Sequence, residues 1–174
     1  WTDSVARAAR QIADSRRKIS KDVTLIQSQT EISATQIQLV RTARSILTST
    51  GSRSHNKEYL AAIEKRLGEV STLEYTRILF GPIRRDELRT HCADLVKSAV
   101  LANRARVVQV VDIDRLAESF FISNDTETLL IIPSLNSIGR FDCGLLLRGQ
   151  YHKMARNVLD SYAKAAIPWN PSLP

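Results

Sequence analysis

The chain has 174 residues, of which 43% are hydrophobic and 25% charged, and its formal net charge is +7. This length fits one ordinary domain plus an extension, and the composition is that of a folded protein with a core of its own. No apolar run approaches the roughly 20 residues that a membrane-spanning helix requires, and the N-terminus lacks the apolar segment of a secretory signal. We therefore predict a cytoplasmic protein without a membrane span.

The two cysteines do not indicate metal or redox chemistry. Cys92 and Cys143 lie far apart, and neither belongs to a CxxC motif or has a histidine at metal-ligand spacing. Both fall in apolar patterns and are predicted to be small buried hydrophobic residues, with the neighbouring His91 as a structural histidine. The sequence also contains no Gly-rich phosphate loop and no G-x-S-x-G motif. We predict no metal site and no cofactor.

The first fifty residues contain neither Gly nor Pro, and apolar residues recur in them at intervals of seven. Such a repeat is typical of a helix that buries a seam against another helix. We therefore predict one long coiled-coil-like helix over residues 1–50, which serves for dimerisation and signalling. The predicted dimerisation seam consists of Val5, Ile12, Ile19, Val23, Ile26, Ile37, Val40 and Leu47.

Two features of this segment leave alternatives open. Half of the companion seam positions are polar, and the stretch from residue 28 to 35 is rich in Ser, Thr and Gln, which are modest helix formers. A bend there would fold the segment into an antiparallel helical hairpin, and a third arrangement packs the helix onto its own domain. The sequence leaves open whether the helices of a dimer pair parallel or antiparallel.

The positive charge is concentrated in the same segment. Nine basic and four acidic residues lie within the first 55 positions. A basic helix can follow nucleic acid or an anionic lipid surface. Here the basic residues are spread along the helix, and no aromatic residue stands between them to stack on bases. Nucleic acid is therefore the weaker expectation, and a solvated face is the simpler interpretation.

Past Gly51 the pattern becomes that of an α/β domain, predicted over residues 56–167 and followed by a Pro-rich tail at 168–174. The expected helices are 57–69, 87–101 and 154–166, and the expected strands are 75–80, 106–111, 120–123, 129–132 and 144–147. The turn Asn124-Asp125 joins two of these strands as a hairpin. The order predicts a single sheet of about five strands with helices on its faces.

Three passages of this domain resemble a C-terminal domain found in uncharacterised bacterial regulators, often of the helix-turn-helix type. They are LEYTRILFGP (73–82), ESFFISNDTETLLIIPSLN (118–136) and RFDCGLLL (140–147). That domain is in turn similar, in the order of its elements, to one half of the phospholipase D fold. The resemblance implies a phospholipase D-like sheet flanked by helices, and a role in regulation.

The phospholipase D signature, H-x-K-x4-D-x6-G-S-x-x-N, is incomplete in this chain. With its Asp on Asp125, Glu118 stands at the His position and Phe120 at the Lys position, whereas Asn136 matches the final Asn. In that family the His attacks phosphorus, while the Lys and Asn stabilise charge on the phosphoryl oxygens. Glu118 would repel an anionic substrate and Phe120 supplies no donor. We therefore predict no catalytic residues.

Candidate ligand-binding residues lie where strands end, the usual location in open α/β sheets. Arg84 and Arg85 open a predicted helix directly after strand 75–80, and a helix N-terminus together with guanidinium groups can hold an anion such as phosphate. The simpler interpretation is that both arginines are solvated. Asp125 and Asn136 are further candidates, although both residue types are common in turns.

Together these observations predict a non-catalytic regulatory or sensing module. It would form a homodimer through the helical segment and bind a ligand or a protein partner with its α/β domain. Two alternatives are a phosphodiesterase or nuclease of the phospholipase D type with a substitute nucleophile, and a nucleic-acid-associated structural protein that uses the basic helix. The sequence does not identify the ligand or the signal.

Overall fold

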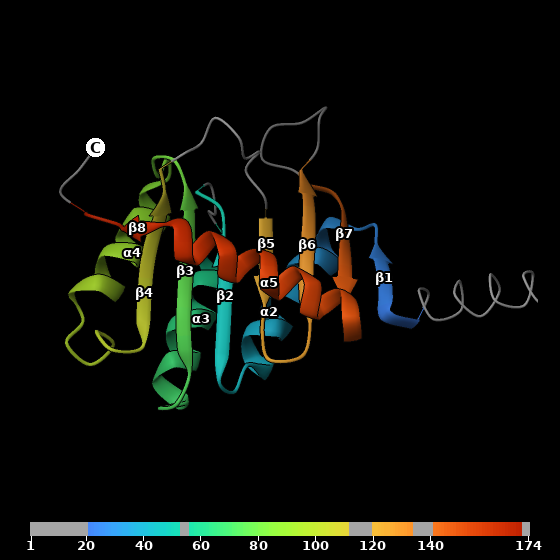
Figure 1. The fold of residues 1–174 in the computed structure, drawn as a ribbon, viewed down its shortest axis with the longest axis horizontal. Coiled ribbons are helices and arrows are strands. Elements are labelled where there is room, and N and C mark those ends of the chain that lie inside the picture. Colours follow the sequence, from blue (N-terminus) through green and yellow to red (C-terminus); the bar gives the residue numbers. More distant parts are fainter. Residues whose placement is uncertain (1–20, 53–55, 112–119, 134–140, 172–174) are drawn as a thin grey trace, which may run out of the picture.

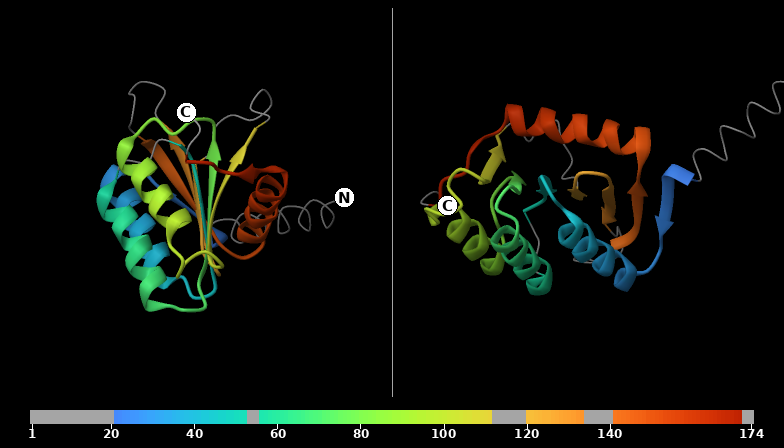
Figure 2. Two further views of the ribbon diagram at one scale, coloured as in Figure 1. Left: turned by 90° about the vertical axis from the view of Figure 1, so that its left-hand side faces the viewer. Right: turned by 90° about the horizontal axis from the view of Figure 1, so that it is seen from below.

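The computed structural model describes residues 21–52, 56–111, 120–133 and 141–171, which form one eight-stranded mixed sheet with helices on both faces. The strand order is β1-β7-β6-β5-β2-β3-β4-β8. The strands are β1 (Val23–Ile26), β2 (Ile46–Thr50), β3 (Glu74–Phe80), β4 (Ala105–Val110), β5 (Phe120–Ser123), β6 (Thr128–Pro133), β7 (Phe141–Leu147) and β8 (Ile167–Pro168). The helices are α2 (Gln29–Thr42), α3 (Lys57–Glu69), α4 (Asp86–Lys97) and α5 (Gly149–Ala165). Helices α2, α3 and α4 cover one face of the sheet, and α5 crosses the other (Figures 1 and 2).

The strand directions bring the carboxyl ends of five strands to one edge, including that of β1, because β7 is antiparallel to both β1 and β6. β2, β3 and β4 are parallel, and β6 runs the same way because β5 is antiparallel to both β2 and β6. Their carboxyl ends meet at the edge drawn at the top of Figure 1, which we call the upper end of the sheet. Helices α3 and α4 follow β2 and β3 and therefore begin at this end. Open α/β sheets bind ligands at this kind of edge.

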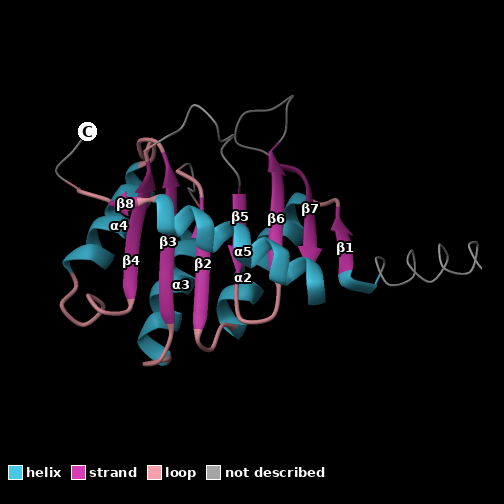
Figure 3. Ribbon diagram, in the orientation of Figure 1, coloured by secondary structure: helices cyan, strands magenta, loops and turns pink. Residues whose placement is uncertain are grey.

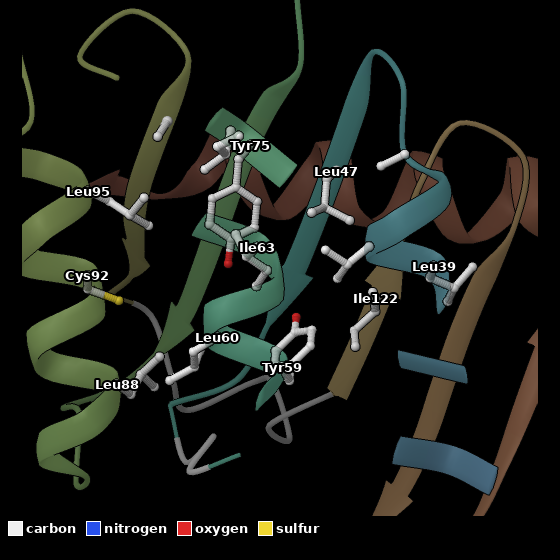
Figure 4. Close-up of a cluster of buried hydrophobic side chains, with 14 of the residues drawn as sticks. Leu39, Leu47, Tyr59, Leu60, Ile63, Tyr75, Leu88, Cys92, Leu95 and Ile122 are labelled. Carbon is white, nitrogen blue, oxygen red and sulfur yellow. The ribbon is translucent and has the colours of Figure 1, made fainter. Parts of the chain in front are cut away.

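The main core lies between the sheet and the three helices on one face. It includes the fully buried residues Leu39, Leu47, Ile63, Tyr75 and Leu88 (Figure 4). On the opposite face, a smaller cluster packs side chains of β3 and β4 against α5, namely Ile78, Phe80, Val108, Val110 and Leu159. The central strand β3 is therefore buried on both faces, as expected for parallel strands covered by helices on both sides.

The predicted α/β order is confirmed for the second part of the chain. Helix α3 has the predicted bounds, and the five predicted strands correspond to β3 to β7 (Figure 3). Helix α4 ends at Lys97, short of the expected 101, and α5 begins at Gly149, before the expected 154. The fold class, an α/β sheet flanked by helices, was therefore predictable from apolar patterning alone.

The prediction of one continuous helix over residues 1–50 is wrong for residues 21–50, which form β1, α2 and β2. The predicted break at residues 28–35 is not found, because α2 is continuous over Gln29–Thr42. The chain leaves regular structure only at residues 27 and 28, between a strand and a helix, so the helical hairpin is also wrong there. Among the predicted seam residues, Val23 and Ile26 lie in β1, Ile37 and Val40 in α2, and Leu47 in β2. Ile26, Val40 and Leu47 are buried in the core of this same domain. Val5, Ile12 and Ile19 lie outside the described residues.

Local signals explain this difference. Ser28 is the N-cap of α2 and accepts a hydrogen bond from the backbone N–H of Glu31 (3.0 Å), so a Ser-x-x-Glu spacing typical of helix starts lies inside the supposed long helix. The segments 23–26 and 46–50 contain several β-branched residues, which favour strands, and both pair with neighbours in the sheet. The sevenfold spacing therefore joins apolar positions of three different elements.

The sheet also extends past both predicted limits of the domain. β1 and β2 precede residue 56, so the α/β domain includes residues assigned to the helical segment. At the other end, β8 pairs antiparallel with β4. The next residue, Trp169, is buried, and its backbone N–H donates to the carbonyl oxygen of Val107 (2.9 Å). The predicted tail at 168–174 thus begins inside the fold.

Candidate functional site

Arg84 and Arg85 lie at the upper end of the sheet, between β3 and α4. Both are exposed, and Arg85 is the N-cap residue of α4 without a side-chain hydrogen bond to the helix. The backbone N–H of Arg84 donates to the carbonyl oxygen of Ser52 (3.5 Å), which connects the segment after β3 to the segment after β2. The two arginines therefore directly precede a helix N-terminus, and their role in anion binding stays a prediction.

Asp125 lies at the opposite end of the sheet, in the turn between β5 and β6 (Figure 1). Its carboxylate accepts hydrogen bonds from the backbone N–H groups of Arg44 (2.7 Å), Ser45 (3.0 Å) and Ile46 (3.2 Å). Partial burial raises the pKa of the Asp125 carboxyl, but these backbone donors together outweigh it and hold the pKa below its ordinary value. Asp125 thus anchors the junction of α2 and β2 and does not share a site with Arg84 and Arg85.

The neighbouring Asn124 supports the same turn from inside. Its Oδ1 accepts from the backbone N–H groups of Thr126 and Glu127 (3.0 Å each), and its Nδ2 donates to the carbonyl oxygen of Leu39 (3.1 Å) and to Thr42 Oγ1 (3.0 Å). The buried amide is therefore fully bonded. The Asn124-Asp125 turn exists as predicted. Through the hydrogen bonds of Asn124 to Leu39 and Thr42, it connects the β5–β6 hairpin to the last turn of α2.

Of the other signature positions, the structure describes Phe120 and not Glu118 or Asn136. Phe120 begins β5 and makes an edge-to-face contact with Phe141 at the start of β7, with ring centroids 5.9 Å apart. Both rings are partly buried and pack against the main core. The position that carries Lys in the phospholipase D signature is thus occupied by an apolar packing residue, which offers no donor to a phosphate.

Arg77, in the middle of β3, is a buried charged residue that sequence analysis did not single out. It is only 1% exposed. Its Nη1 donates to Ser49 Oγ (3.1 Å) and its Nη2 to the carbonyl oxygen of Gly51 (2.6 Å), whereas its Nε has no hydrogen-bond partner among the described residues. Within the described part of the chain, no carboxylate forms an ion pair with Arg77. The available signal was an arginine within the mostly apolar strand segment YTRILF.

Two tyrosines surround Arg77. Tyr75 Oη lies 2.7 Å from Ser49 Oγ. Tyr59, on α3, is 2% exposed, and its hydroxyl makes no hydrogen bond of ordinary geometry within the described part of the chain, although Ser49 and Arg77 lie near it. Figure 4 shows the two hydroxyl groups turned toward each other between α3 and β3. We refer to Arg77, Ser49, Tyr59, Tyr75 and the carbonyl group of Gly51 as the Arg77 cluster.

The Arg77 cluster is cationic. Burial raises the pKa of Tyr59 and of Tyr75, and it outweighs the opposing effect of the nearby Arg77 charge on both. Both hydroxyls therefore keep their protons at neutral pH. Burial by itself lowers the pKa of Arg77, but its two tyrosine neighbours raise it above the ordinary value. The cluster thus contains one positive charge and two protonated hydroxyl groups.

His91 and Cys92 of α4 lie beside this cluster. His91 Nδ1 is 2.7 Å from Glu64 Oε1, and its ring contacts Tyr75 edge-on, with centroids 6.4 Å apart. Burial lowers the pKa of His91 and raises the pKa of the Cys92 thiol to about 11. His91 therefore bridges α4 and α3, as expected of a structural histidine, and Cys92 is a buried thiol held in its protonated form.

A separate polar row lies beneath α5 on the other face. Thr128 Oγ1 is 2.8 Å from Ser123 Oγ and 2.9 Å from His152 Nδ1, and Arg156 Nη1 donates to Thr48 Oγ1 (2.9 Å). Burial, followed by the nearby Arg156 charge, lowers the pKa of His152. These contacts fix the orientation of α5 across β2, β5 and β6.

The described residues contain neither a metal-binding cluster nor a helix able to span a membrane. No group of three or more His, Cys, Asp or Glu side chains there is arranged to hold a metal ion. None of the helices in these segments combines the length and apolar character needed to cross a bilayer.

Comparison with known proteins gives no matching protein-family model and no matching curated protein. Solved structures, however, share the fold. NucT from Helicobacter pylori is similar over 84% of this chain and 98% of its own, with a TM-score of 0.64 and 12% identity. Nuc from Salmonella typhimurium, a phospholipase D family member, is similar over 85% of this chain and 97% of its own, with a TM-score of 0.57 and 9% identity.

A third structure belongs to a protein of a different kind. TrmBL2, described as an archaeal chromatin protein with a novel mode of DNA binding, is similar over 97% of this chain and 67% of its own, with a TM-score of 0.65 and 8% identity. At these identities the similarity defines the fold alone. The chain therefore has a phospholipase D-like fold, in agreement with the resemblance in its sequence.

Proposed function

We propose that this chain is a non-catalytic phospholipase D-like domain with a regulatory or sensing role, which binds a ligand or a protein partner at the upper end of its sheet. The observation that carries the proposal is the contact between Phe120 and Phe141. Cleavage by the phospholipase D mechanism needs a nucleophile and cationic or amide donors around the phosphoryl oxygens. An aromatic pair packed on the core at the Lys position cannot supply them.

A hydrolysis assay tests the absence of catalysis. The purified protein is expected to release no p-nitrophenol from bis(p-nitrophenyl) phosphate above the buffer rate, with and without a metal chelator. Asn136→Ala, which removes the remaining donor of the signature, should leave this baseline unchanged. Gly68→Ala serves as the control variant, because nothing lies within 4 Å of a Cβ added there. Turnover that Asn136→Ala abolishes would overturn the proposal in favour of an enzyme with a substitute nucleophile.

The proposed homodimer now depends on the first three seam positions, because the later ones lie within the domain. Val5, Ile12 and Ile19 keep the sevenfold spacing expected of a helical seam. Light scattering at micromolar concentration should give twice the monomer mass for the native chain, and the monomer mass for Ile12→Lys with an unchanged circular dichroism spectrum. A native monomer at this concentration would refute the dimer.

A second candidate function, nucleic-acid association, is supported by two observations. The net charge is +7, with nine basic residues in the first 55 positions, and the fold is similar to that of a DNA-binding chromatin protein over nearly the whole chain. Binding to phosphate groups releases counterions, so the affinity for duplex DNA should fall steeply between 50 and 200 mM salt, on the order of several tenfold steps for six or more contacts. An affinity that does not change with salt would exclude this candidate.

A further inference from the structure

We propose that the Arg77 cluster is the binding site for a small oxyanion, a phosphate or carboxylate group carried by the ligand of this domain. The inference deepens the proposed ligand-binding role and rests on it. It names the chemical class that the ligand presents and the side chains that recognise it.

The first argument concerns charge. A buried ion is strongly disfavoured unless it is paired, and buried arginines are therefore usually found with carboxylates. Among the residues that the structure describes, Arg77 donates only to neutral acceptors, Ser49 Oγ and the carbonyl oxygen of Gly51. A guanidinium group has five N–H donors, and the Nε–H of Arg77 finds no acceptor in the described segments. A phosphate or carboxylate would supply both the missing negative charge and the missing acceptor.

The second argument is the buried hydroxyl of Tyr59. It makes no hydrogen bond of ordinary geometry to any described residue, although Ser49 and Arg77 both lie near enough to lower its pKa. Tyr75 offers a contrast, because its hydroxyl is bonded to Ser49. Two orphaned buried polar groups, the Tyr59 hydroxyl and the Arg77 Nε–H, thus come from facing elements of one cluster. Both can donate to the same oxyanion, which satisfies them together.

The third argument is the position of the cluster. Ser49 and Gly51 lie at the carboxyl end of β2, and Tyr59 lies in the first turn of α3, whose N-terminus favours negative charge. The exposed Arg84 and Arg85 stand at the same end of the sheet. Arg77 would therefore hold the anionic group, while the remainder of the ligand lies toward the strand ends. The cluster contains no negative group that would attract a cation.

Nuclear magnetic resonance of the Arg77 Nε–H tests binding directly. The signal of this buried group is assigned by its loss in Arg77→Lys, and it is followed while inorganic phosphate or acetate replaces chloride at constant ionic strength. We expect a saturable shift with phosphate or acetate and none with chloride, and the anion that saturates first distinguishes a phosphate-bearing from a carboxylate-bearing ligand. The absence of a saturable shift with either anion would overturn the site.

A matched pair of tyrosine variants separates recognition from folding. Tyr59→Phe should raise the dissociation constant of the anion about tenfold, the effect of one hydrogen bond to a charged group at the low end of its range, without lowering the melting temperature. Tyr75→Phe, which removes a bonded hydroxyl, should lower the melting temperature. Unchanged anion affinity in Tyr59→Phe would contradict the proposal. Phosphodiester turnover would overturn the proposed function without affecting these binding data, so the two failures are distinguishable.

Discussion

The carboxylate of Asp125 offers a sharp test of how the two ends of the sheet differ in role. Oδ2 accepts from the backbone N–H groups of Arg44 and Ser45 (2.7 and 3.3 Å), and Oδ1 accepts from those of Ser45 and Ile46 (3.0 and 3.2 Å). Asp125→Asn keeps the size of the side chain but replaces one of these oxygens with an NH₂ group. In either orientation of the amide, at least one backbone N–H then faces a donor.

The expected cost follows from these contacts. A hydrogen bond to a charged group contributes about 1.5–3 kcal/mol, and water at this exposed turn replaces part of what is lost, so we expect the free energy of unfolding to fall by about 1–2 kcal/mol at pH 7. Because the pKa of Asp125 is lowered in the folded protein, its contribution is complete above the unfolded pKa of about 3.9 and is lost as the pH falls through the folded pKa. The difference between native and variant should therefore shrink below about pH 4.

Urea denaturation followed by circular dichroism measures both quantities. Asp160→Asn is the matched control, since Asp160 is an exposed carboxylate that pairs with Arg156 at 3.4 Å on the surface of α5. Its loss should cost no more than about 0.5 kcal/mol, as for other exposed helix pairs. If Asp125→Asn is no more destabilising than Asp160→Asn, or if its effect persists unchanged at acidic pH, the anchoring role of Asp125 is refuted.

Three further predictions concern the rest of the fold. Gly68→Ala should raise the free energy of unfolding by about 0.5–1 kcal/mol, because Gly68 lies in α3 and an added Cβ meets nothing within 4 Å; a decrease would contradict this. Leu47→Ala should lower it by about 2–5 kcal/mol and leave the mass in solution unchanged, since Leu47 is a core residue rather than a seam residue; light scattering checks the second part. Burial lowers the pKa of His152 in the folded protein, whereas the unfolded chain has the ordinary histidine pKa of about 6.5. The unfolded chain therefore binds more protons near and below that pH, so the free energy of unfolding should fall as the pH is lowered from 7.5 to 5. The fall should be smaller in His152→Gln.

The candidate site was only partly predictable. Arg84 and Arg85 follow a strand and precede a helix in the sequence, and the structure places them at the end of the sheet where ligands are expected. Asp125 was grouped with them through a motif alignment, but that alignment carries no information on which end of a strand a residue occupies. The Arg77 cluster combines residues of β2, α3 and β3 that no spacing rule connects, and their proximity depends on strand register.

By itself, the amino-acid sequence determined the α/β class, the order of elements after Gly51 and the loss of the phospholipase D signature, because apolar periodicity and residue identity are local properties. Only the tertiary structure showed that residues 21–50 form β1, α2 and β2 of the domain instead of a dimerisation helix. Burial of Ile26, Val40 and Leu47 in the domain core removes the same apolar surface from water as a dimer seam would. The spacing of apolar positions in the sequence does not show which of the two surfaces covers them. Tertiary packing likewise decided that a charged side chain such as Arg77 is enclosed between sheet and helix.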